Sequence, residues 1–160
     1  MRWESLIAAS RILADLDDNA GSDDDLVSAR LGKAVSAAYY AMFHALAQNN
    51  ADRLVGESET DRESGAWRRT YRSLEHRTAY RQLSEARISD YSDQIRDFGT
   101  VFRELQDRRH QADYDPQSRF SRAETLSLIV KAEATIRDFL TATAPERREL
   151  AAHVLFPSRA

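Results

Sequence analysis

Residues 91–112 carry the strongest pattern in the sequence, in which core-type side chains recur at alternating steps of four and three. Seven positions follow this spacing, and they are Tyr91, Ile95, Phe98, Phe102, Leu105, Arg109 and Ala112. Steps of three and four place side chains on one side of an α-helix, whereas a half-buried strand would show strict alternation. A helix with a continuous apolar seam has to pack against other helices, because the seam is unfavourable in water. This segment therefore predicts a helical bundle.

The rest of the chain also has helical periodicity, and it has only five glycines and three prolines in 160 residues. Few glycines and prolines leave few helix breaks, and no stretch alternates as a strand would. We predict helices over residues 3–17, 22–49, 65–87, 90–112 and 121–143. Asn-Ala-Gly at 19–21 ends the first of these, and Ser22 begins the second. Residues 50–64 are polar and break the pattern, so we interpret them as a loop.

These segments predict an all-α fold, an antiparallel up-and-down bundle of four to five helices. We assign the bundle to residues 1–144 and a C-terminal tail with a short helix to residues 145–160. The length suits one domain with a real hydrophobic core.

Several classes of protein are excluded by what the sequence lacks. It has no cysteine, its five glycines are scattered, and none of its four histidines has a glutamate three residues before it. Disulfide scaffolds, glycine-rich phosphate loops and bundle-type di-iron sites are therefore not expected. We expect no metal ion and no cofactor. No apolar run approaches the ~20 residues that span a bilayer, and the first residues do not resemble a signal peptide, so we expect a cytoplasmic protein without a membrane segment.

Charge is distributed unevenly along the chain. The net charge is −3, but residues 62–87 carry seven arginines against three glutamates, a net of +4. Arg69, Arg72 and His76 lie near one another in this segment by helical spacing. Such a segment is either a solvated helix face or a surface that contacts phosphate groups.

Two further pairs stand out near the end of the seam. Arg109 occupies a seam position, where burial would require partners, and Asp113 one turn later supplies a carboxylate. Arg103 and His110 are seven residues apart on the flank of the same helix. A histidine that moves a proton beside an arginine that stabilises phosphoryl charge suits metal-free RNA cleavage. The alternatives are an Arg–Asp pair that fixes the helix end and two ordinary residues on a polar face.

Two segments resemble a known family. Residues 30–47 (RLGKAVSAAYYAMFHALA) resemble the Tyr-Tyr-Ala-x-Phe-His-Ala helix of HEPN domains (higher eukaryote and prokaryote nucleotide-binding). Residues 105–116 (LQDRRHQADYDP) are similar to the Arg-x-x-Ala-Asp-Tyr-Asp ending of one prokaryotic branch of that family. The resemblance covers about residues 3–143.

The resemblance implies a helical bundle that dimerises. It also implies one of two functions: an RNase or toxin whose sites face each other across the dimer, or an inactive module that partners a minimal nucleotidyltransferase. The nuclease motif of the family is an arginine, four to six residues, and a histidine. Arg103 and His110 meet this spacing, whereas Asp113 and Tyr114 stand where a histidine would follow Arg109.

We therefore expect a HEPN-like protein of a prokaryotic toxin–antitoxin or defence system that binds or cleaves RNA as a metal-free endoribonuclease. The expected partners are a second copy, through the second and fourth helices or their flanks, RNA or a nucleotide, and a nucleotidyltransferase. The alternative is a catalytically inactive module that binds a nucleotide or a protein. The candidate catalytic residues are Arg103, Arg109 and His110, and the candidate binding or orienting residues are Asp113, Tyr114, Arg69, Arg72 and His76.

Overall fold

A computed structural model of the chain describes residues 2–16 and 23–159, and all regular structure in these two ranges is helical. The all-α prediction is confirmed. The elements in chain order are α1 (Trp3–Asp15), α2 (Asp24–Leu54), α3 (Glu59–Glu63), α4 (Gly65–Arg72), α5 (His76–Ser84), the 3-10 helix η1 (Ala86–Asp90), α6 (Asp93–Tyr114), α7 (Arg122–Phe139) and α8 (Ala144–Leu155).

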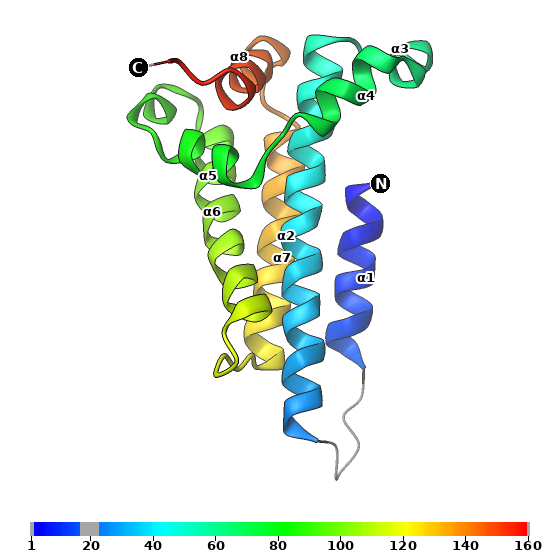
Figure 1. Ribbon diagram of the computed structural model, residues 1–160, viewed down its shortest axis with the longest axis vertical. Helices are drawn as coiled ribbons and strands as arrows, with labels where there is room; N and C mark the ends of the chain where they lie inside the picture. The colour runs from blue at the N-terminus through cyan, green and yellow to red at the C-terminus, as the bar shows by residue number, and fades with distance from the viewer. Residues whose placement is uncertain (1, 17–22, 160) are drawn as a thin grey trace.

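The long helices α1, α2, α6 and α7 lie side by side and alternate in direction along the chain (Figure 1). Helix α2 runs through the middle of the bundle and contacts α1, α6, α7 and α8. The short helices α3, α4, α5 and α8 gather at the end of the bundle where α2 finishes (Figure 1). Helix α4 packs on α2, while α5 packs on α6 and α8.

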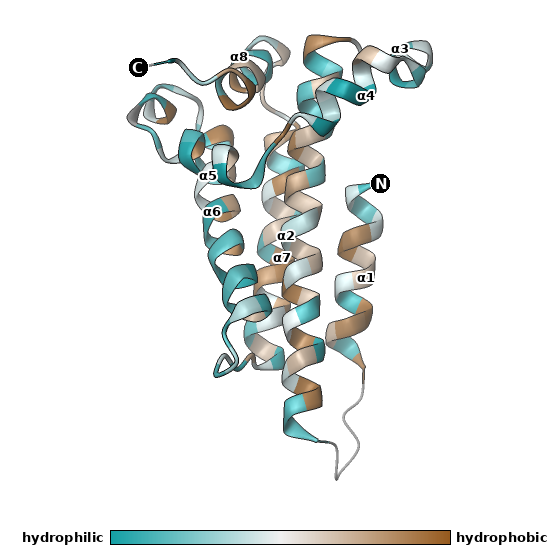
Figure 2. Ribbon diagram, in the orientation of Figure 1, coloured by the Kyte–Doolittle hydropathy of each residue, from teal (hydrophilic) through white to brown (hydrophobic). Residues whose placement is uncertain are grey.

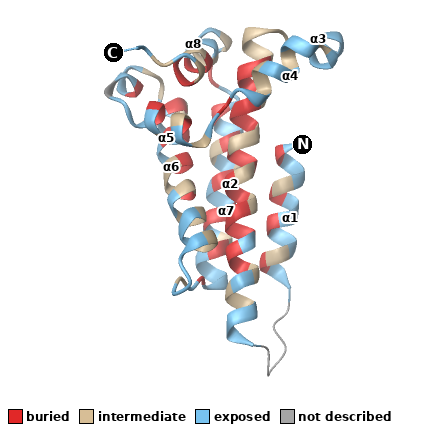
Figure 3. Ribbon diagram, in the orientation of Figure 1, coloured by how far each residue is buried: buried red, intermediate tan, exposed pale blue. Residues whose placement is uncertain are grey.

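The core follows the predicted seam. Ile95, Phe98, Phe102 and Leu105 of α6 are fully buried, and the ring of Phe98 stacks on that of Phe139 of α7 at 4.3 Å between centroids. Along α2 the buried positions are rich in alanine, which lets neighbouring helices approach closely. Figure 2 shows hydrophobic residues on the inward sides of the long helices, and Figure 3 shows that these sides are buried.

The prediction of a loop over residues 50–64 is wrong. Helix α2 continues to Leu54, and α3 begins at Glu59 after a capping box in which the Ser58 hydroxyl and the Asp61 carboxylate each accept a backbone N–H. At the end of α2 the polar side chains of Asn49 and Asn50 are buried, and the Asn49 amide donates to the Arg147 carbonyl of α8 at 3.2 Å, whereas most polar residues of α3 and the turn before it are exposed. Gly56 makes the turn between the two helices at φ +149°, a conformation that favours glycine.

The single helix predicted over 65–87 is also wrong, because the chain turns after Arg72 and forms α4, α5 and η1. The Ser73 hydroxyl donates to the Arg69 carbonyl near the end of α4, and Leu74 in the turn is buried in the core. The turn is favoured because it lets α4 pack on α2 and α5 pack on α6.

The predicted tail forms a twelve-residue helix, α8, whose Leu150, Ala151 and Val154 are buried. Residues 145–155 therefore belong to the same core as the bundle. The helix break predicted at 19–21 and the helix start predicted at Ser22 lie outside the described residues.

Candidate functional site

Arg109 and Asp113 form an ion pair on α6 that faces α2. The Arg109 Nε donates to the Asp113 carboxylate at 3.0 Å, and each side chain is only 16% exposed. From α2, the Ser36 hydroxyl donates to the same carboxylate at 2.9 Å, and Lys33 Nζ lies 3.3 Å from it. Gly32 makes this approach possible, since a Cβ there would lie 3.3 Å from the Cβ of Ala112. Asp113 therefore joins α6 to α2.

The environment of Asp113 favours its ionised form. Burial raises the pKa of this carboxyl, but the hydrogen bonds from Ser36 and Lys33, with the charges of Lys33 and Arg109, outweigh burial and lower the pKa. Asp113 is thus a carboxylate at neutral pH.

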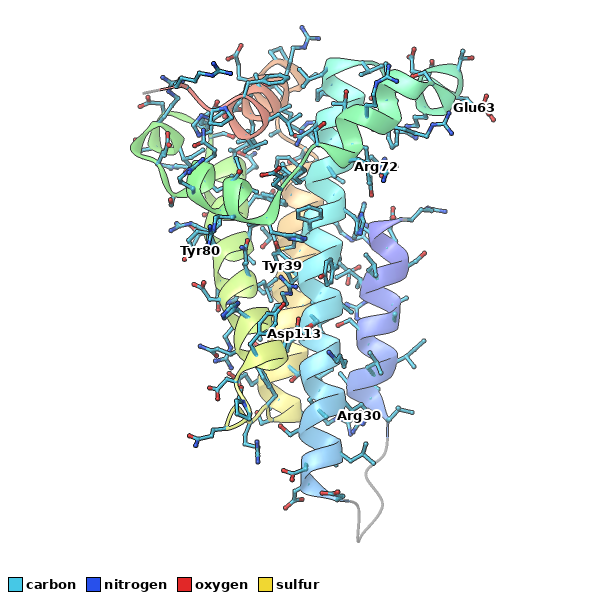
Figure 4. All side chains as sticks on the ribbon, in the orientation of Figure 1. Arg30, Tyr39, Glu63, Arg72, Tyr80 and Asp113 are labelled. Carbon is cyan, nitrogen blue, oxygen red and sulfur yellow. The ribbon has the colours of Figure 1, made fainter. Side chains whose placement is uncertain are left out.

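Two tyrosines of α2 complete the surroundings of Arg109. Its Nη2 donates to the Tyr40 hydroxyl at 3.1 Å. The guanidinium carbon also lies 5.2 Å from the ring centre of Tyr40 and 5.6 Å from that of Tyr39, within the range of cation–π attraction. Figure 4 shows Tyr39 between α2 and α6, and Asp113 of α6 lower down, where this helix lies beside α2.

A ring of hydrogen bonds fixes the protonation of His76, the first residue of α5. The Gln106 amide nitrogen donates to the His76 carbonyl at 3.3 Å, so the amide oxygen faces the Tyr39 hydroxyl and accepts from it at 3.1 Å. A phenol has one proton to donate, so His76 Nδ1, 2.7 Å from the same hydroxyl, must be the donor. In the neutral ring Nε2 then carries a lone pair, and no partner for it is found in the described part of the chain.

The position of His76 keeps it neutral. Its ring stacks on Phe43 at 4.0 Å between centroids, and burial, with the charges of Arg109 and His44, lowers its pKa. His44 lies in the same stretch of α2, where its Nδ1 and the Tyr71 hydroxyl of α4 are 2.5 Å apart, and burial lowers its pKa as well. A neutral imidazole with a free Nε2 beside an arginine can accept a proton or a hydrogen bond.

Other candidate residues from the sequence lie outside this cluster. His110 and Tyr114 are exposed on α6, and their rings pack on each other at 4.8 Å. Arg103 is half-buried and donates from Nε to the Gly99 carbonyl of its own helix at 3.3 Å. The structure thus brings together Arg109, Asp113 and His76, and it does not bring His110 or Tyr114 into contact with them.

Arg69 and Arg72 belong to a second candidate site. Five exposed arginines of α4 and α5 make no ion pair with any described residue, and we call them the α4–α5 arginine surface: Arg68, Arg69, Arg72, Arg77 and Arg81. Figure 2 shows hydrophilic residues along these two helices. Many arginines elsewhere are paired, such as Arg122 with Asp15 and Arg137 with Glu133 on α7.

Four residues of the cluster around Arg109 were not predicted as site residues, namely Tyr39, Tyr40, His44 and Gln106. The aromatic residues resemble ordinary core residues by spacing, and Gln106 carries no signal in the sequence. The Tyr-Tyr-Ala-Met-Phe-His motif was the only available indication, because it places two hydroxyls and an imidazole within about two turns of one helix.

Among the described residues no group of three or more histidine, aspartate or glutamate side chains is arranged to hold a metal ion. None of the helices in the same ranges combines the length and hydrophobicity needed to cross a membrane. Comparisons with protein-family models, curated proteins and solved structures found no match.

Proposed function

We propose that this chain is a HEPN-like bundle of a prokaryotic toxin–antitoxin or defence system and that it binds RNA. The observation that carries this proposal is the α4–α5 arginine surface, which has no acidic partners among the described residues. Arginine binds phosphate through two parallel N–H donors, and phosphate contacts supply most of the affinity of nucleic-acid binding.

Two features support RNA as the ligand. The chain as a whole is acidic, so a local excess of unpaired arginines is a specific feature and not a consequence of bulk charge. Trp67 and Tyr71 of α4 and Tyr80 of α5 are half-buried beside these arginines, and aromatic rings stack on unpaired bases.

The geometry around His110 supports binding over cleavage at the predicted catalytic residues. Arg109 is already engaged by Asp113 and Tyr40, and His110 is exposed and packs on Tyr114. A nuclease site would need the imidazole and the guanidinium to converge on one phosphate.

Metal-free RNA cleavage remains a second candidate function, with His76 in place of His110. Its Nε2 lone pair is suited to accept the proton of a 2′-hydroxyl, and the charge of Arg109 helps to keep the ring neutral. Cleavage of RNA without divalent metal should then be lost in His76→Ala and kept in His110→Ala. Equal cleavage by the two variants would exclude His76 as the proton acceptor.

The proposed partners are a second copy of the chain and a small nucleotidyltransferase. Light scattering of the purified protein gives the oligomeric state directly, and a monomer at all concentrations would exclude the homodimer.

Fluorescence anisotropy with a labelled single-stranded RNA tests the main proposal. We expect the triple variant Arg69→Gln/Arg72→Gln/Arg77→Gln to bind at least tenfold more weakly, because each lost phosphate contact weakens binding. The control is Arg122→Gln/Arg137→Gln, which removes two paired arginines of α7. Equal affinity of the triple variant and the wild type would contradict the proposal.

A further inference from the structure

A groove opens beside the α4–α5 arginine surface, between the start of α1, the second half of α2, and helices α3 and α4. Its volume is about 480 Å³, and it is lined by Arg2, Glu4, Gln48, Arg62, Trp67 and Tyr71. This volume lies within the range of pockets that bind small organic ligands, roughly 300–1,000 Å³.

Asp52 organises one wall of the groove. Its side chain is only 10% exposed, and its carboxylate accepts from Arg62 Nε at 3.0 Å and Nη2 at 2.7 Å. The same carboxylate accepts from the indole nitrogen of Trp67 at 2.9 Å. One buried carboxylate therefore holds a guanidinium and an indole ring in fixed orientations.

The aromatic rings of the groove form a row. The rings of Trp67 and Tyr71 are 5.1 Å apart with 25° between their planes. The ring of Tyr71 in turn stacks on that of His44, with 5.8 Å between the ring centroids and 26° between the planes. Because these rings face one another, a flat ligand would extend the row by stacking on its terminal ring, Trp67.

The charged side chains of the groove indicate which part of a nucleic acid the groove would bind. Arg62 is paired with Asp52, and Arg2 lies 3.8 Å from Glu4, so the charged side chains compensate one another. An anion gains little from arginines that are already paired, whereas an uncharged flat ring gains from stacking. The Gln48 amide nitrogen donates to the Asp52 carboxylate at 3.5 Å, so the amide oxygen of Gln48 is left to accept from the polar edge of such a ring.

We propose that this groove binds one nucleobase of single-stranded RNA, stacked on Trp67, while the adjoining phosphates contact the unpaired arginines of α4. Figure 4 shows Arg72 between α4 and the start of α1, next to this part of the molecule. The inference rests on the proposed RNA-binding function, and it adds where the base lies.

Tryptophan fluorescence tests this base site directly, because the chain has only two tryptophans and Trp3 is 7% exposed in the core. In Trp3→Phe protein the emission comes from Trp67 alone. We expect adenosine monophosphate to quench it saturably, whereas ribose 5-phosphate, which lacks the base, leaves it unchanged. If Trp3→Phe fails to fold, the difference between the wild type and Trp67→Phe gives the same information.

Anisotropy with a short single-stranded RNA separates this inference from the function on which it rests. Trp67→Leu should weaken binding about tenfold, the usual effect of losing one stacked base. RNA that binds the wild type without quenching Trp67 would overturn the base site and leave RNA binding standing. RNA that does not bind at all would overturn the proposed function itself. Equal quenching by ribose 5-phosphate would also overturn the base site, since it would show that the sugar phosphate is sufficient.

Discussion

Replacing Asp113 by alanine should destabilise the fold, because this carboxylate links α6 to α2. The change removes the acceptor of Arg109, Ser36 and Lys33 and leaves a guanidinium that is 16% exposed without its carboxylate. A hydrogen bond between charged groups contributes about 1.5–3 kcal/mol, and breaking a fully buried pair costs about 3–5 kcal/mol. Since this pair keeps some exposure, we expect the free energy of unfolding to fall by about 2–3 kcal/mol.

Urea denaturation followed by circular dichroism measures this loss. The matched control is Asp93→Ala on the same helix, because Asp93 pairs with Arg96 at the surface, where its side chain is 78% exposed. Surface pairs contribute about 0–1 kcal/mol, so the control should lose little. In the double variant with Arg109→Met, much of the loss from Asp113→Ala should disappear, since no unpaired charge remains.

The loss of stability caused by Asp113→Ala should depend on pH, because the pKa of the Asp113 carboxyl is lowered in the folded protein. A carboxyl with a folded-state pKa below its ordinary 3.8 stabilises the fold fully above pH 3.8, and this contribution is lost as the pH falls through the folded-state value. The wild type and Asp113→Ala should therefore become more similar in stability below pH 3.8.

One result would refute the reasoning about Asp113. If Asp113→Ala lowered the free energy of unfolding at pH 7 by less than about 0.5 kcal/mol, as little as Asp93→Ala does, Asp113 would behave as a surface carboxylate.

Three further predictions concern other parts of the chain. Gly56→Ala should cost about 1–3 kcal/mol in thermal unfolding, because its φ is +149° and a Cβ would lie 2.2 Å from the Asp61 carboxylate; an unchanged melting temperature would contradict this. Phe102→Ala should cost about 3–5 kcal/mol in urea, since the side chain is fully buried, and a loss under 1 kcal/mol would contradict the assigned core. The lowered pKa of His76 means that its protonation opposes folding, so stability should fall as the pH drops below 6.5. His76→Gln should reduce this fall in melting temperature between pH 7.5 and 5.5, and an identical fall in both proteins would contradict the lowered pKa.

The seam shows what sequence periodicity can predict. Ile95, Phe98, Phe102 and Leu105 are buried as the spacing requires, since helical geometry alone decides which residues share a face. The pairing of Arg109 with Asp113 is predictable for the same reason, because residues four apart on a helix are neighbours.

The hydrogen-bond ring of His76 shows what periodicity cannot predict. It joins Tyr39 of α2, His76 of α5 and Gln106 of α6, which lie at least 30 residues apart in the chain. No local rule relates them, because their proximity depends on how three helices pack. The turn after Arg72 is unpredictable on the same ground, since no glycine or proline marks it and packing on two different helices favours it.

The polar segment 50–64 shows how composition can mislead. Asn49 and Asn50 are buried because α8, almost 100 residues later, covers the end of α2. One local signal was present, since Ser58-x-x-Asp61 has the spacing of a capping box and places the start of α3.

RNA binding by the α4–α5 arginine surface is tested most directly by the salt dependence of the binding constant. For single strands the slope of log K against log salt is about −0.7 for each phosphate neutralised, so contacts from all five arginines would give a slope of about −3.5. Arg72→Gln/Arg77→Gln should make this slope shallower by about 1.4, whereas Arg122→Gln/Arg137→Gln should leave it unchanged. Equal slopes for the wild type and Arg72→Gln/Arg77→Gln would contradict the assignment of RNA to this surface.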